Sequence, residues 1–292
     1  MDAQFSHVLN VISEDAGVVV AEIGAFLNTP AKCLSELYAY DIPIEGNPQE
    51  ALALARNVAG STAADINVVA TENRRKRLLI ADMDSTIINC ECLDELADMA
   101  GLKPKVSAIT ERAMRGEIEF AGALRERVGL LKGLPLEALE RVWRERIRLN
   151  PGAKELVATM KANGARTLLV SGGFTFFTSR VAEAAGFDDH QSNVLLDDGK
   201  ALTGDVLGPI LGREAKLAAL ENAVAKLGIG FSDALAVGDG ANDLAMIRRA
   251  GLGVAYHAKP VVAAAAGASI AHNDLTALLY LQGYRDEEIV RS

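Results

Sequence analysis

The sequence is poor in cysteine and has no long apolar stretch. Its three cysteines, Cys33, Cys90 and Cys92, are odd in number, and their C-x-C pair has the spacing of neither a zinc ribbon nor a thioredoxin motif. We therefore expect neither a disulfide framework nor a zinc site. No apolar run approaches the length that spans a bilayer, and the amino terminus lacks a basic segment followed by an apolar one. These absences predict a cytoplasmic protein that has no membrane partner.

Positive charge is also scarce. The 292 residues carry 30 Lys and Arg against 39 Asp and Glu, a net charge of −9, and the isoelectric point is near 5.1. A nucleic-acid partner would require a basic face that neutralises backbone phosphates, so this class of partner is excluded. With 50% hydrophobic residues, the chain can bury a full core, and its length predicts one large and one small domain.

The first seventy or so residues predict a small α+β domain. Short apolar runs, among them 7–12 and 66–69, are separated by turn-prone segments such as 44–48. The basic cluster 73–77 follows, and we interpret it as a solvated linker rather than a nucleic-acid patch. The sequence therefore predicts a first domain over residues 1–72 and a second over 73–292.

The second domain shows the alternation of an α/β fold. Apolar runs at 78–81, 167–170, 235–237 and 252–255 predict strands, and amphipathic helical patterns lie between several of them. In the helix after Arg213, the residues Leu217, Leu220, Val224 and Leu227 share one face, and Gly228 ends it. The alternation indicates a parallel sheet sandwiched by helices.

Two regions depart from this alternation. Residues 92–149 show successive charged helical patterns without an obvious strand, which predicts a helical cap inserted after the first strand of the sheet. The runs 193–196 and 202–206 flank Asp197-Asp198-Gly199-Lys200, a strong signal for a β-hairpin.

The first chemical cluster is Asp82-Met83-Asp84-Ser85-Thr86, directly after the strand at 78–81. A carboxylate can attack phosphorus and divide one difficult displacement into two easier ones, and Asp82 is the candidate nucleophile. A phosphate monoester loses a poor leaving group, which an acid must protonate, and Asp84 is the candidate acid and base. A D-x-D pair on its own is more often a polar loop.

Two further clusters are suited to holding phosphate. Ser171-Gly172-Gly173 follows the strand at 167–170, where a hydroxyl and open backbone N–H groups can grip phosphate oxygens. Lys216 lies in the first turn of its helix, where its ammonium adds to the attraction of a helix amino terminus for anions. Taken singly, a Ser-Gly-Gly turn is usually only a turn, and a lone lysine is usually a surface residue.

The fourth cluster, Gly238-Asp239-Gly240-Ala241-Asn242-Asp243, follows the strand at 235–237. Its carboxylates form an oxygen-rich site suited to Mg²⁺, with Asp239 as a direct ligand. Asp243 lies one helical turn later and would bind the metal through water or pair with Lys216. The EF-hand ladder and the G-x-G-x-x-G dinucleotide fingerprint are both absent from this segment.

In this order, and each at a strand end or a helix start, the four clusters resemble those of the phosphoserine phosphatases of the haloacid dehalogenase superfamily. The resemblance runs from about residue 78 to the carboxyl terminus. It implies a Rossmann-like parallel sheet and Mg²⁺-dependent hydrolysis of O-phospho-L-serine through an aspartyl-phosphate, the last step of serine biosynthesis.

The resemblance also implies a role for each residue. Asp82 becomes phosphorylated, and Asp84 moves protons while its backbone carbonyl binds Mg²⁺. The implied Mg²⁺ ligands are Asp82, Asp84 and Asp239, with Asp243 belonging to the metal site behind them. Residues that match phosphoryl-binding positions are Ser171, Gly172 and Lys216, and Asn242 falls where the family contacts phosphate or its ordered water.

A selective phosphoserine pocket should offer one cation and one anion for the substrate's carboxylate and ammonium. Glu91 and Arg127 fit this requirement, and the resemblance favours this role for Arg127, which taken alone would more often belong to a solvated helix face. By the same resemblance, Met114 and Phe120 match apolar lining positions of the cap.

Alternatives remain for both domains. The enzyme could hydrolyse another small phosphomonoester or transfer phosphoryl to an alcohol, and a receiver-like signalling module also combines acidic residues with a lysine. Asp84 and the predicted cap argue against a receiver. Domain 1–72 resembles the ACT-like domains of long phosphoserine phosphatases but lacks a glycine-rich ligand turn. We expect either a degenerate ACT-like domain that serves homodimer formation or a purely structural extension.

Overall fold

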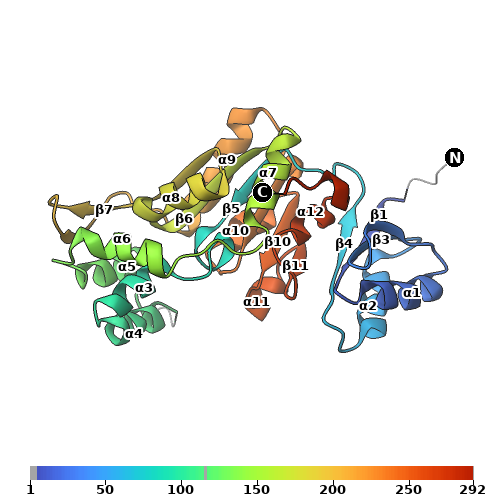
Figure 1. Cartoon of the computed structure of the whole chain (residues 1–292), viewed down its shortest axis with the longest axis horizontal. Helices are drawn as coiled ribbons and strands as arrows, with labels where there is room; N and C mark the ends of the chain where they lie inside the picture. The colour runs from blue at the N-terminus through green and yellow to red at the C-terminus, as the bar shows by residue number, and fades with distance from the viewer. Residues whose placement is uncertain (1–4, 115–116, 292) are drawn as a thin grey trace.

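The computed structural model describes residues 5–114 and 117–291, which form a small amino-terminal unit and a larger unit (Figure 1). The small unit has the element order β-α-β-β-α-β. Its elements are β1 (His7–Ile12), α1 (Ala16–Leu27), β2 (Lys32–Ser35), β3 (Ala39–Pro43), α2 (Pro48–Ala59) and β4 (Asp65–Ala70). The strands form an antiparallel sheet in the order β2-β3-β1-β4.

The larger unit follows with alternating strands and helices. Its strands are β5 (Leu78–Ala81), β6 (Arg166–Phe174), β7 (Asp189–Asp197), β8 (Leu202–Leu207), β9 (Ala234–Gly238), β10 (Leu252–Tyr256) and β11 (Ala268–Ile270). Its helices are α3 (Cys92–Met99), α4 (Lys103–Met114), α5 (Phe120–Gly129), α6 (Leu136–Glu145), α7 (Ala153–Ala162), α8 (Thr175–Ala185), α9 (Arg213–Leu227), α10 (Leu244–Arg249), α11 (Pro260–Ala263) and α12 (Ala277–Leu281).

The seven strands of the larger unit form one mostly parallel sheet, in the order β11-β10-β9-β5-β6-β7-β8. Only β8 runs antiparallel to its neighbour, because it returns from β7 through the predicted hairpin. The four predicted strands fall within β5, β6, β9 and β10. The predicted α/β fold with a parallel central sheet is therefore confirmed.

Both faces of this sheet are buried, which explains why its central strand is continuously apolar. Leu78 and Ile80 of β5 face a cluster that includes Leu220 of α9 and Met246 of α10. Leu79 and Ala81 face the opposite cluster, which contains residues of α7 and α8. Successive residues of a strand point to opposite faces, so a strand covered by helices on both sides has no position for a polar residue.

The segment predicted to be helical lies at one end of the sheet (Figure 1). Helices α3, α4, α5 and α6 occupy it between β5 and α7, and it contains no named strand among the described residues. Apolar residues of these helices, including Leu96, Leu124 and Val142, join the same cluster as the sheet.

The amino-terminal sheet uses its two faces differently. On one face, Leu9 and Val11 of β1 pack with α1 and α2 in a separate core. On the other face, Val8 and Ile12 join the core of the larger unit. On this same face, between Val8 and Ile12, the buried Asn10 donates hydrogen bonds to Asp41 and to the carbonyl of Tyr280. The amino-terminal unit is therefore docked on the larger one through a face that combines apolar and polar contacts.

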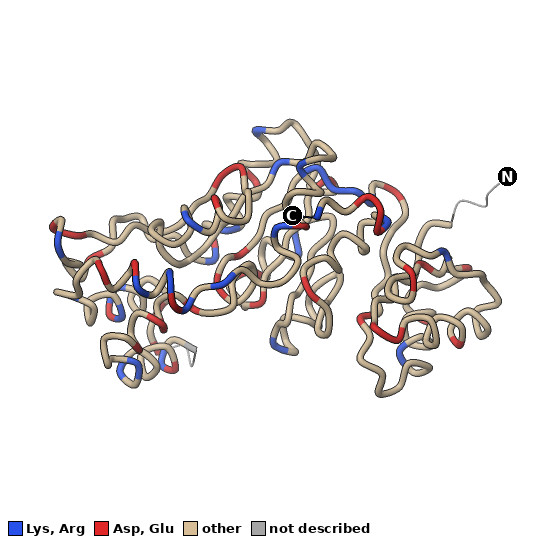
Figure 2. The backbone as a smooth tube through the Cα atoms, viewed as in Figure 1, with Lys and Arg blue, Asp and Glu red and all other residues tan. Residues whose placement is uncertain are grey.

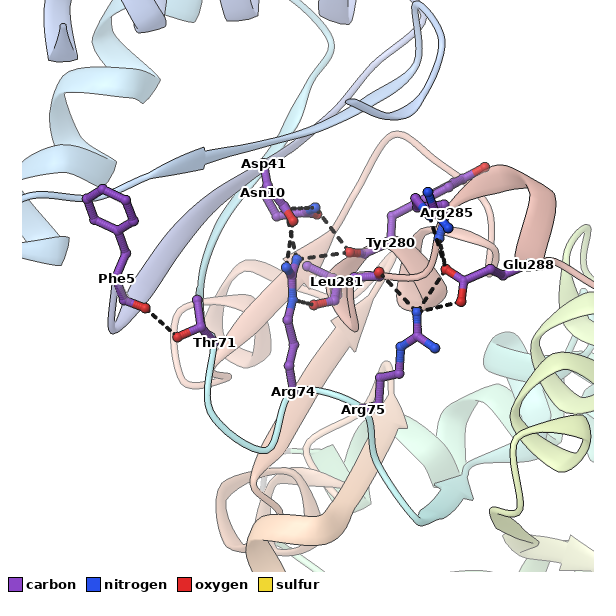
Figure 3. Close-up of polar contacts among 11 residues, drawn as sticks. Phe5, Asn10, Asp41, Thr71, Arg74, Arg75, Tyr280, Leu281, Arg285 and Glu288 are labelled. Atoms are coloured by element: carbon purple, nitrogen blue, oxygen red, sulfur yellow. Dashed lines mark hydrogen bonds and ion pairs between the residues drawn. The ribbon is translucent and has the colours of Figure 1, made fainter. Parts of the chain in front are cut away.

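The basic cluster at 73–77 helps to hold the two units together, so its interpretation as a solvated linker is wrong. Arg74 donates hydrogen bonds to both carboxylate oxygens of Asp41 and to the carbonyls of Tyr280 and Leu281 (Figure 3). Its side chain is only 13% exposed. Arg75 pairs with Glu288, which places the basic run beside acidic residues near the carboxyl terminus (Figure 2). The run itself gave no sign of these partners, because they lie far from it in the sequence.

We expect Arg74→Met to lower the free energy of unfolding by about 3 kcal/mol, because it leaves the buried Asp41 carboxylate without its cationic partner. Arg285→Met is the control, since Arg285 pairs with Glu287 and Glu288 in exposed ion pairs, and its effect should stay within about 0.5 kcal/mol. Urea titration of both variants measures the difference. Equal midpoints would contradict the docking role of Arg74.

Candidate active site

The predicted catalytic residues come from neighbouring strands of the sheet. Asp82 directly follows β5, Asp239 directly follows β9, and Ser171 lies in the last part of β6. Strands β9, β5 and β6 are adjacent and parallel. Their carboxyl ends therefore meet at one edge, where open α/β sheets place their ligands.

Lys216 is the centre of the charged site. Its Nζ lies 2.6 Å from Asp82 Oδ1 and 2.6 Å from Asp243 Oδ1. The lysine is 1% exposed, and Asp243 is fully buried. Burial alone would lower the pKa of Lys216, but the carboxylates of Asp243 and Asp82 outweigh it and raise the pKa above its ordinary value. The ammonium therefore stays charged and screens both carboxylates.

Asp82, Asp239 and Asp243 form an acidic group that could hold a metal ion. Each offers one carboxylate oxygen, and these oxygens all lie within 4.8 Å of one another. Burial, followed by the charge of Asp243, raises the pKa of Asp239 to about 6 and that of Asp82 well above its usual range. Three crowded carboxylates with one ammonium leave an excess of negative charge, which a divalent cation would relieve.

Asp84 lies against the end of β6. Its carboxylate accepts hydrogen bonds from the Cys92 backbone N–H at 2.9 Å and from the Ser171 hydroxyl at 3.1 Å. Burial raises its pKa, although the hydrogen bonds from Cys92 and Ser171 partly oppose this. The structure thus brings Asp84 and Ser171, from two of the predicted clusters, into direct contact.

The loop that carries these aspartates is held by residues to which the sequence gave no role. Asn150 donates to the carbonyls of Thr86 and Ile88, at 2.8 and 3.1 Å. The Thr86 hydroxyl donates to Asp239 at 3.3 Å. Thr86 was visible next to the D-x-D pair, but nothing in the sequence pointed to Asn150, because its partners lie more than sixty positions earlier.

Glu91 directly precedes α3, at the end of this loop. Its carboxylate accepts a hydrogen bond of 2.7 Å from the hydroxyl of Ser85, whose φ of 56° is unusual for a residue other than glycine. One side of Glu91 reaches solvent. The protein packed around its other side raises its pKa to about 7, and the negative charge of Asp84 adds to the effect.

Arg127 lies in α5, where its Nε donates to the Ala123 carbonyl and its Nη1 to the Thr110 hydroxyl. Burial lowers the pKa of its guanidinium, while the charges of Asp94 and Glu91 oppose the shift. These two carboxylates act on Arg127 through their negative charge. Arg127 is therefore a half-buried side chain in the field of Asp94 and Glu91, and not part of a solvated helix face.

The remaining predicted residues are placed as follows. Phe120 begins α5 and is 38% exposed, and its ring lies against Gly172 and Gly212. Met114 ends α4, and its side chain lies outside the described part of the structure. Asn242 folds back over Gly240, since a Cβ added there would lie 2.2 Å from Asn242 Oδ1.

The site thus combines a buried aspartate at a strand end, an ammonium that screens it, an acidic group for a cation and a second carboxyl group beside a serine hydroxyl. This equipment suits chemistry on a negatively charged substrate, where positioning and charge stabilisation dominate. Together, the fold and the site define an α/β protein with an acidic centre at the carboxyl edge of a mostly parallel sheet.

The family of haloacid dehalogenase-like hydrolases matches residues 79–248, more than half of the chain, and the chain belongs to this family. A phosphoserine phosphatase from Archaeoglobus fulgidus is 50% identical over 208 residues, which cover 71% of this chain but 60% of that protein. A phosphoserine phosphatase from Polaromonas sp. is 50% identical over 210 residues, or 70% of this chain and 89% of that protein.

One solved structure matches nearly the whole chain. A HAD family hydrolase from Salmonella enterica subsp. enterica serovar Typhi is 29% identical, with a TM-score of 0.85, and the match covers 94% of this chain and 98% of that one. Among the described helices of the present chain, none is both long and apolar enough to cross a membrane.

Gly238 allows Asp243 to approach Lys216. A Cβ at position 238 would lie 2.4 Å from the Asp243 Cγ, so we expect Gly238→Ala to displace Asp243 and destabilise the protein by about 1–3 kcal/mol. Gly122 is the control, because a Cβ there meets nothing within 4 Å and alanine favours its helix. Calorimetry of both variants measures the difference, and an unchanged melting temperature for Gly238→Ala would contradict this packing.

Proposed function

We propose that this chain is a Mg²⁺-dependent phosphatase that hydrolyses O-phospho-L-serine to L-serine and phosphate. The observation that carries the proposal is the convergence of Asp82, Lys216 and the acidic group at one sheet edge. The names of relatives that are 50% identical support the choice of substrate. The activity is that of the last step of serine biosynthesis, which fits a cytoplasmic enzyme.

The reaction begins at Asp82. Its carboxylate attacks phosphorus, and a new P–O bond forms while the bond to the serine oxygen breaks. Asp84 donates its proton to the departing oxygen, a role favoured by its raised pKa. Asp84 then accepts a proton from a water molecule whose oxygen attacks phosphorus, so that phosphate leaves and the Asp82 carboxylate is regenerated.

Lys216 and the phosphate-binding groups screen the approach of one anion to another. The Lys216 ammonium already lies at Asp82, and the Ser171 hydroxyl with the backbone at Gly172 would grip the phosphoryl oxygens. Asn242 would contact phosphate or its ordered water. The carboxylates of Asp82 and Asp239 and the backbone carbonyl of Asp84 would hold Mg²⁺, with Asp243 behind them. When bound, Mg²⁺ supplies charge neutralisation for the phosphoryl group.

Substrate choice falls to helices α3 to α6, which we propose act as a cap. Arg127 would bind the substrate carboxylate and Glu91 its ammonium, while Met114 and Phe120 would line the pocket. The contact of Phe120 with Gly172, beside the phosphate-gripping serine, supports this placement. So does the field of Asp94 and Glu91 on the half-buried Arg127 guanidinium.

For the amino-terminal unit, we propose a degenerate ACT-like domain that serves homodimer formation. Its β-α-β-β-α-β order and antiparallel sheet support this assignment. The alternative is a structural extension, which the core shared with the larger unit would favour. Sedimentation of the full chain distinguishes the two hypotheses. We expect a dimer if the unit is an ACT-like dimerisation domain, and not if it is a structural extension.

Phosphate release from a panel of phosphomonoesters tests the main proposal. We expect a preference for O-phospho-L-serine, loss of activity with excess EDTA and recovery with Mg²⁺. We expect Asp84→Asn to lower kcat by about 10²- to 10⁴-fold, because the general acid is lost. Equal rates across the panel would contradict the substrate, and normal turnover of Asp84→Asn would contradict the mechanism.

The proposed roles of Arg127 and Glu91 can be distinguished by comparing two substrates. We expect Arg127→Met to lower kcat/KM for O-phosphoserine by about 10- to 100-fold, through loss of a charge-assisted hydrogen bond. The same variant should change kcat/KM little for O-phosphoethanolamine, which lacks the carboxylate. Glu91→Gln should instead affect both substrates, since both carry the ammonium. An equal loss on both substrates with Arg127→Met would contradict its assignment.

A further inference from the structure

Strand β6 bulges at Ser171, the serine proposed to bind the phosphoryl group. Its pairing with β7 is regular up to Val170 and resumes at Phe174, which lies opposite Asn193, with a register shift between them. The shift covers Ser171, Gly172 and Gly173. A bulge takes backbone groups out of the ladder, so those groups need other partners.

Asn193 supplies one of these partners. Its side chain is 2% exposed, and its Nδ2 donates to the Gly172 carbonyl at 2.8 Å. The same Nδ2 donates to the Leu211 carbonyl at 3.1 Å, and Oδ1 accepts from the Leu211 N–H at 2.7 Å. One side-chain amide thus gives the Gly172 carbonyl, at the bulge, a hydrogen-bond partner. The same amide pairs with both backbone groups of Leu211 in a second segment.

The second segment leads to Lys216. Leu211 precedes Gly212, whose carbonyl accepts a hydrogen bond from the Lys216 backbone N–H at 3.2 Å in the first turn of α9. Asn193 therefore ties the backbone next to Ser171 to the backbone that starts the helix of Lys216. Phe120 packs on the same two segments, since a Cβ at Gly172 or Gly212 would lie 3.3 or 3.0 Å from its ring.

We propose that Asn193 is a positioning residue that sets the distance between the hydroxyl of Ser171 and the ammonium of Lys216. The inference rests on the proposed function, in which these two groups grip the same phosphoryl group. Ser171 and Lys216 lie far apart in the sequence, so no short stretch of backbone fixes the distance between them. The buried amide of Asn193, which hydrogen-bonds to both of their segments, is a rigid connection between them. A shift of about 1 Å between gripping groups costs binding and rate.

Asn193→Ala tests the proposal, with Asn67→Ala as a matched control. Asn67 is also 2% exposed, and its side chain makes two hydrogen bonds to the backbone of Ser269, between β4 and β11. Calorimetric titration with inorganic phosphate in the presence of Mg²⁺ gives a dissociation constant that is independent of turnover. Steady-state kinetics with O-phosphoserine gives KM and kcat.

We expect Asn193→Ala to raise the phosphate dissociation constant and KM by about tenfold or more, while Asn67→Ala leaves both within twofold even if it lowers the melting temperature. If the alanine variant does not fold, Asn193→Ser is measured in its place. Unchanged phosphate binding in a folded Asn193 variant, or an equal loss in Asn67→Ala, would overturn this inference and leave the proposed function intact. A wild-type chain that neither binds phosphate nor hydrolyses phosphomonoesters would overturn both.

Discussion

The ammonium of Lys216, buried between the carboxylates of Asp82 and Asp243, is the interaction on which the site depends. An ammonium taken out of water is costly unless charged partners surround it, and two carboxylates taken out of water repel each other. Each of the three groups is therefore acceptable inside the protein only because the other two are present. This requirement links the end of β5, the start of α9 and the start of α10.

The fold meets this requirement through its parallel sheet. Because β9, β5 and β6 end at the same edge, residues that lie up to 161 positions apart, from Asp82 to Asp243, come into one site. Gly238 admits the Asp243 carboxylate, and Asn150 holds the loop after β5 by two of its carbonyls. The sheet thus places the catalytic residues at one edge. Gly238 leaves room for the Asp243 carboxylate, and the Asn150 amide fixes the loop that carries Asp82 and Asp84.

Much of this arrangement could be predicted from the sequence, since it rests on local patterns. A strand buried on both faces is a continuous apolar run, as in Leu78–Ala81, and parallel strands place the polar residues after them at one edge. Other features depend on partners that no local pattern contains. Arg74 was misread because Asp41 and Tyr280 are distant in sequence, and Asn193 was unremarked because the bulge opposite it exists only in the paired sheet. The roles of Glu91, Arg127 and the cap stay predictions.

The proposed mechanism requires Asp82 to be the nucleophile, and detection of the phosphorylated enzyme is the direct test of this role. The enzyme is mixed with ³²P-labelled O-phosphoserine and Mg²⁺, quenched in acid within the first turnover, reduced with borohydride and mapped by mass spectrometry. We expect acid-stable label on the protein and a reduced residue at position 82, both absent from Asp82→Asn. Label at another residue, or rapid turnover without any protein-bound label, would contradict it.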